Sequence, residues 1–100
     1  NSPQIKNIEV KGNVVLLNLE YSEGLHFLNK ESRLFEVADK DGKFFPAKAI
    51  IEKNTIKVSA KEVKNPIFVR YSFSNTAIPD IFNQSGLPLS TFEIKNNQLR

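Results

Sequence analysis

Apolar and polar residues alternate with a period of two along most of this chain. The pattern is clearest in residues 8–11, 14–21, 34–38, 55–59 and 66–74, and it is present in 44–51. Successive side chains of a β-strand point to opposite faces of the sheet, so this alternation predicts half-buried strands. In residues 14–21 it places Val15, Leu17, Leu19 and Tyr21 on one face. No segment combines helical capping with a period of 3.6, and we therefore predict an all-β fold.

Turn signals separate the predicted strands. Gly12-Asn13 and Asp41-Gly42 contain residues that tolerate the positive φ of tight hairpin turns. Pro46 cannot donate a ladder hydrogen bond, so it marks an edge strand or a bulge within 44–51. About seven short strands with such turns between them are typical of an immunoglobulin-like β-sandwich. A jelly-roll arrangement fits the same strand count.

The alternation stops between residues 75 and 91. This stretch contains Pro79, Gly86 and Pro88 and has few charges, and it is long for a loop in a compact domain. It also contains apolar residues, and we expect the loop to pack against something; they are Ile78, Ile81, Phe82, Leu87 and Leu89. Residues 92–94 predict a last short strand, and 96–98 a frayed tail.

The composition excludes several classes of protein. With 100 residues, of which 40% are hydrophobic, the chain suits one folded domain spanning residues 1–100. The absence of Cys excludes disulfides and thiolate metal sites, and a single His excludes a multi-His metal site. Basic residues alternate with acidic ones, which argues against nucleic-acid binding, and no apolar run approaches the roughly 20 residues of a membrane helix. We expect no metal, cofactor, nucleic-acid or membrane partner.

Few residues are candidates for catalysis. His26 is a possible general base, but its apolar neighbours favour a half-buried histidine at a strand edge. No G-x-S-x-G nucleophile elbow occurs, and Gln84-Ser85-Gly86 resembles a turn. Asp39 and Asp41 are possible paired carboxylates or calcium ligands, although their place in a hairpin favours local hydrogen bonds. We therefore predict no catalytic residue in this chain.

Arg70 and three amide side chains are candidates for binding. An arginine inside an aromatic strand must reach solvent or a carboxylate, which favours an outward-facing Arg70 or a pair with Glu on the next strand. The alternative is an anchor for the long loop or for a neighbouring domain. Asn75, Asn83 and Gln84 are possible ligands for sugar hydroxyls, but backbone capping is the favoured interpretation.

Residues 65–75 and 81–92 carry a recognisable pattern. They follow the form N-P-x-x-V-R-Y-x-[WF]-x-N and then x-N-x-x-G-L-P-x-x-x-F. The matching residues are Asn65, Pro66, Val69, Arg70, Tyr71, Phe73, Asn75, Asn83, Gly86, Leu87, Pro88 and Phe92. The chain thus resembles the C-terminal segment of sialate O-acetylesterases, which remove acetyl groups from sialic acids. Segments 34–38 and 41–49 resemble the preceding β segment of the same family, so the resemblance covers about residues 1 to 95.

This resemblance implies a division of labour. Catalysis in the family uses an SGNH-type serine hydrolase domain whose motifs lie N-terminal to this region, and none of them occurs here. The resemblance implies a non-catalytic accessory domain that braces that catalytic domain, in a secreted or periplasmic parent. The expected interface residues are Arg70, Tyr71, Phe73, Ile78, Ile81, Phe82, Asn83, Leu87 and Leu89.

Two other functions remain open at this point. The main alternative is a carbohydrate-binding module, with sugar as a possible partner, because β-sandwiches often bind sugars. A standalone enzyme lacks a nucleophile–base pair to support it. The chain has no Met, so we expect a fragment or a processed chain, and a missing signal peptide then says nothing about secretion.

Overall fold

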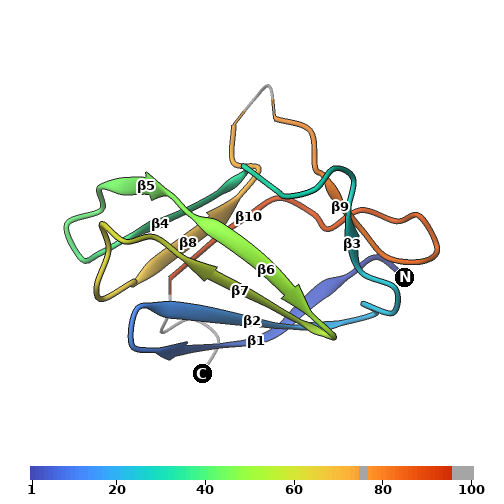
Figure 1. The fold of residues 1–100 in the computed structure, drawn as a ribbon, viewed down its shortest axis with the longest axis horizontal. Helices are drawn as coiled ribbons and strands as arrows, with labels where there is room; N and C mark the ends of the chain where they lie inside the picture. Colours follow the sequence, from blue (N-terminus) through green and yellow to red (C-terminus); the bar gives the residue numbers. More distant parts are fainter. Residues whose placement is uncertain (75–76, 96–100) are drawn as a thin grey trace.

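Two four-stranded antiparallel sheets form the fold in a computed structural model that describes residues 1–74 and 77–95 (Figure 1). The first sheet has the order β1-β2-β7-β6, comprising β1 (Gln4–Lys11), β2 (Val14–Glu20), β7 (Thr55–Ser59) and β6 (Lys48–Glu52). The second has the order β10-β8-β4-β5, comprising β10 (Phe92–Lys95), β8 (Phe68–Tyr71), β4 (Phe35–Ala38) and β5 (Phe44–Pro46). A short pair, β3 (His26–Phe27) with β9 (Ile81–Phe82), completes the described strands.

The strand order confirms the immunoglobulin-like prediction. When β1, β2, β4, β5, β6, β7, β8 and β10 are lettered A, B, C, C′, D, E, F and G, the sheets read ABED and GFCC′. This is the arrangement of immunoglobulin-type sandwiches, extended by one edge strand. The sequence alone left the strand order open between this arrangement and a jelly roll.

The inward-facing residues of both sheets form one apolar core. Val15, Leu17 and Leu19 of β2 are buried, as the alternation predicted. Their neighbours in the core include Ile56, Val58, Phe35, Val37, Val69 and Tyr71. The prediction for Tyr21 is wrong, because β2 ends at Glu20 and Tyr21 has a φ of 56°. The alternation does not continue through this residue, and its side chain is half exposed.

The described residues contain ten strands rather than about seven, and one reason is a change of sheet at Ala47. Pro46 pairs with Glu36 in the second sheet, whereas Lys48 pairs with Ser59 in the first. The predicted strand 44–51 is therefore two strands, and Pro46 lies on the edge strand β5, as its missing N–H required.

The predicted strand 66–74 is shorter than expected. It contains β8 alone, because Ser72 adopts a φ of 52° and donates its N–H to the carbonyl of Leu34. The long loop that follows is less irregular than predicted, since it contains β9. Asn75 and the predicted tail at 96–98 lie outside the described residues. The part of the chain that the structure describes contains no helix able to span a membrane.

Candidate docking surface at the loop end of the sandwich

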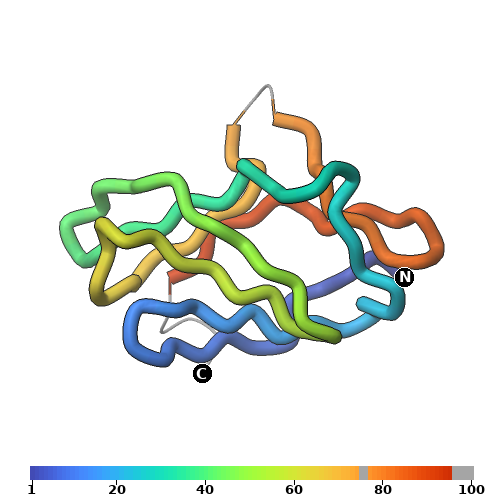
Figure 2. Tube along the Cα trace, viewed as in Figure 1, coloured from blue at the N-terminus to red at the C-terminus, as the bar shows by residue number. Residues whose placement is uncertain are grey.

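Two long connections meet at one end of the sandwich. Residues 21–34 link β2 to β4, residues 72–91 link β8 to β10, and the β3–β9 pair joins the two connections. The N-terminus lies at the same end, on the right in Figures 1 and 2. We call residues 21–34 and 77–91 the loop end. It combines rigid internal bonding with the most exposed apolar side chains that the structure describes.

The first group of hydrogen bonds within the loop end is centred on the hydroxyl of Tyr71, a fully buried residue. This oxygen accepts the N–H groups of Asp80 (2.8 Å) and Ile81 (3.1 Å), and it donates to Asp80 Oδ1 (3.0 Å). Ser32 Oγ donates to the same carboxylate oxygen at 2.9 Å. Burial raises the pKa of the Tyr71 phenol well above its usual value, which keeps it protonated as a donor. We call this arrangement the Tyr71 hub, and it fixes the start of β9 to the core.

The second group of hydrogen bonds is centred on the side-chain amide of Asn83, a residue that is 5% exposed. Its Nδ2 donates to the carbonyls of Asn1 (2.9 Å) and Tyr21 (3.0 Å). Its Oδ1 accepts the N–H groups of Ser85 (3.0 Å) and Leu87 (3.1 Å). All four hydrogen-bonding positions of the amide are therefore occupied by backbone groups. The prediction of backbone capping is confirmed for Asn83, and we call this arrangement the Asn83 clamp.

Gly24 allows the two connections to approach closely. Its φ is 70°, and a Cβ built on it would lie 2.4 Å from Cβ of Gln84. The N–H of Gln84 donates to the carbonyl of Glu23 at 2.8 Å, so the backbones are held together at this point. A side chain at position 24 would force these bonded segments apart.

Replacing Gly24 with alanine is expected to destabilise the fold by about 3 kcal/mol, because left-handed strain and a backbone displacement add together. Gly86→Ala is the matched control, because Gly86 has a φ of 78° and open space around it. It should lose only about 1 kcal/mol to left-handed strain. Urea unfolding of both variants measures the difference. Equal losses of unfolding free energy in the two variants would show that the close approach of Gly24 to Gln84 does not contribute to stability.

The predicted interface residues fall into four groups. Tyr71, Ile81, Asn83 and Leu89 are buried within the sandwich, so they position the loop and present no surface. Phe82 and Leu87 are half-buried on the loop end. Phe73 and Ile78 are 50% and 80% exposed. Arg70 lies on the outer face of the second sheet.

An open groove of about 670 Å³ was not predicted from the sequence. Leu28 and Ile78 line it together with Leu34 and Pro79, and charged residues of both signs also line it; they are Lys30, Glu31, Arg33 and Asp80. Leu28 is 65% exposed. The sequence analysis named Ile78 as an interface residue but did not pair it with Leu28, because the two residues lie far apart along the chain.

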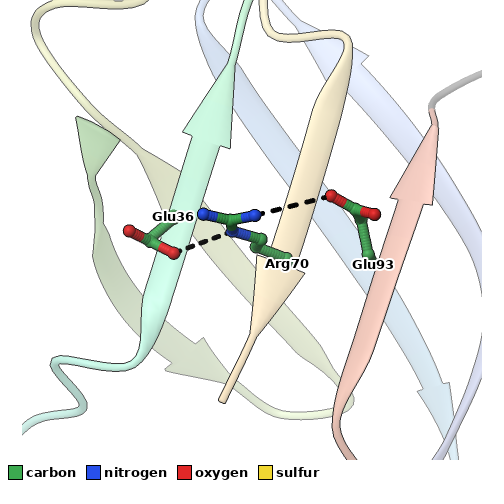
Figure 3. Close-up of polar contacts among 3 residues, drawn as sticks. All are labelled: Glu36, Arg70 and Glu93. Carbon is green, nitrogen blue, oxygen red and sulfur yellow. Dashed lines mark hydrogen bonds and ion pairs between the residues drawn. The ribbon is translucent and has the colours of Figure 1, made fainter. Parts of the chain in front are cut away.

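Arg70 joins three strands of the second sheet (Figure 3). Its Nε lies 2.8 Å from Glu36 Oε1 on β4, and an Nη lies 3.7 Å from Glu93 on β10. Its guanidinium carbon lies 3.7 Å from the centroid of the Phe44 ring on β5. The predicted pairing with Glu on the next strand is confirmed, and the guanidinium is engaged within the sheet.

The other candidates for catalysis have local partners. His26 is exposed, and its Nδ1 lies 2.8 Å from the carbonyl oxygen of Gly24. Asp39 and Asp41 accept the backbone N–H groups of Lys40 (2.6 Å) and Lys43 (3.0 Å), which confirms the turn. Within residues 1–74 and 77–95, no three His, Asp or Glu side chains gather as a metal site would require. The described candidates thus have structural hydrogen bonds.

An immunoglobulin-like sandwich with a built-up loop end defines the class of fold. Comparison with solved structures finds a match to part of one enzyme. That enzyme is XAC1771, described as a novel carbohydrate acetylesterase from Xanthomonas citri, whose crystal structure is known. The TM-score is 0.84 and the sequence identity 26%, and the match covers 94% of this chain and 22% of that chain. The chain thus spans about a fifth of the acetylesterase that it matches. No protein-family model and no curated protein matches the sequence.

Proposed function

We propose that this chain is the non-catalytic C-terminal domain of a sialate O-acetylesterase or a related carbohydrate esterase. In this proposal its loop end braces an SGNH-type catalytic domain of the same polypeptide. The observation that carries the proposal is the asymmetric match, which covers almost all of this chain but 22% of an acetylesterase. Most of such an enzyme lies outside the matched region. The motif resemblance of residues 65–92 independently points to the same enzyme class.

The loop end supports a bracing role. A surface that braces a neighbour gains affinity when its backbone is fixed before contact, because less conformational entropy is lost. The Tyr71 hub and the Asn83 clamp fix this backbone from two sides. Arg70 is engaged within the second sheet, so we assign it to the stability of the sheet.

The alternative, a carbohydrate-binding module, receives no support from Asn83, one of the three amide residues that the sequence offered for it. The amide of Asn83 is occupied by backbone groups. It presents no free polar atom to a sugar. Shifts of loop-end amide signals on addition of sugar to the isolated chain would favour this alternative.

The proposal is tested by acetate release from 9-O-acetyl sialic acid and from acetylated xylan. The three samples are the parent protein, the parent without this domain, and the isolated chain. We expect activity in the parent and none in the isolated chain, and the preferred substrate decides whether the sialate assignment holds. Activity in the isolated chain, or a parent that hydrolyses neither ester, would overturn the proposal.

A further inference from the structure

The most exposed apolar side chains of the described residues occur together in one groove. Ile78 and Leu28 are 80% and 65% exposed, more than any other large hydrophobic residue described. They line the same open groove, with Pro79 and Leu34 beside them. An apolar side chain left in water is common, but two of them gathered in a concave surface indicate an interaction site.

The walls of this groove are fixed before any partner arrives. Asp80 joins the two walls, which contain Leu28 and Ile78. Its carbonyl accepts the N–H of Leu28 at 2.7 Å, and Asp80 follows Ile78 and Pro79 in the chain. Its carboxylate is held in turn by Tyr71 and Ser32. Leu28 is therefore exposed on backbone that is bonded to Asp80, and Ile78 lies two residues before Asp80 in the chain.

The start of the chain lies at the loop end, beside the segment that follows β9 (Figure 1). The Asn83 clamp holds Asn1 there through its carbonyl oxygen. If the catalytic domain precedes this chain, as the proposed function states, it is connected at that end. A connected partner has a high effective concentration, so a modest apolar surface is enough to hold it.

We propose that the Leu28–Ile78 groove is the surface on which the catalytic domain of the same polypeptide packs. This inference rests on the proposed function. Lys30 and Arg33 line the groove together with Glu31 and Asp80, and Glu31 pairs with Arg33 at 3.5 Å, so charges of both signs lie beside the apolar residues. The matching surface of the catalytic domain is therefore apolar at its centre, with a polar rim that carries charges of both signs.

Ile78→Asp in the parent tests the inference, with Ile50→Asp as the matched control. Ile50 is also an exposed isoleucine, at 57%, but it lies on β6 of the first sheet. Because both side chains face solvent in the isolated chain, neither substitution should lower its melting temperature by more than about 1–2 °C. In the parent, Ile78→Asp should lower the melting temperature of the catalytic domain to that of the parent without this domain. Ile50→Asp should leave it unchanged.

The possible outcomes separate the two proposals. If removal of the whole domain leaves the catalytic domain as stable as before, the bracing function fails. If removal destabilises it but Ile78→Asp does not, or if Ile50→Asp has an equal effect, the groove assignment alone is wrong. Sedimentation of the isolated chain tests whether the groove instead binds a second copy of the chain. A dimer that Ile78→Asp dissociates would assign the groove to a second copy and overturn the inference.

Discussion

Tyr71→Phe is expected to lower the free energy of unfolding by about 3 kcal/mol, although it removes a single oxygen atom. That oxygen accepts two backbone N–H groups, from Asp80 and Ile81, and donates to the Asp80 carboxylate. Phenylalanine keeps the ring packing against Phe35 but leaves these groups without their partner in a buried site. Urea unfolding monitored by circular dichroism measures the loss.

Tyr21→Phe is the matched control, because the chain has only two tyrosines and Tyr21 is half exposed. Its hydroxyl should contribute less than about 0.5 kcal/mol, as is usual for surface sites. Equal effects in the two variants would show that the hub does not hold the loop. Hydrogen exchange locates the change, since the Ile81 amide should lose its protection in Tyr71→Phe alone.

The same hydroxyl sets an alkaline limit to stability. Burial raises the pKa of Tyr71 in the folded chain above its unfolded value of about 10. The folded state therefore binds the proton more tightly, and this contribution to stability is fully present below about pH 10 and declines as the pH rises further. Absorbance at alkaline pH should show Tyr71 ionising only as the chain unfolds. Ionisation of Tyr71 near pH 10 while the chain is still folded would contradict the hub.

Asn83→Ala is expected to cost about 2–3 kcal/mol, because it leaves the N–H groups of Ser85 and Leu87 without an acceptor. It also releases the carbonyls of Asn1 and Tyr21. The variant should therefore free the N-terminal segment from the long loop. Urea unfolding measures the cost, and exchange of the Leu87 amide reports the opening.

Asn18→Ala is the control for an amide with several hydrogen bonds in a less buried place. Asn18 contacts Asn7, Glu9 and Thr55 on the outer face of the first sheet, where water can replace the lost partners. Its loss should stay below about 1 kcal/mol. If Asn18→Ala is as damaging as Asn83→Ala, burial of the clamp does not explain its importance.

The sequence was most informative where local chemistry decides the structure. A period of two is a property of neighbouring residues, and it located Thr55–Ser59 at its observed bounds. The hairpin at Asp41-Gly42 and the edge position of Pro46 follow from backbone geometry that single residues impose. The change of sheet at Ala47 could not be predicted, because the alternation suits either sheet.

The loop end was less predictable because its contacts join distant residues. Asn83 binds carbonyls that lie 82 and 62 residues away along the chain, and no local pattern encodes such a pair. Ile81 and Leu89 were expected at an interface because the loop is apolar, but both are buried in the core of the sandwich. Leu28 was missed because its apolar partner in the groove lies on the other connection.

Calorimetric unfolding of the intact parent tests the central claim most directly. If this β domain braces an esterase domain, the two should unfold in one cooperative transition, above the melting temperature of the catalytic domain produced alone. The isolated chain should unfold separately and release no acetate. Two independent transitions, each at the temperature of the separated part, would show that the domains do not support one another and would contradict the account.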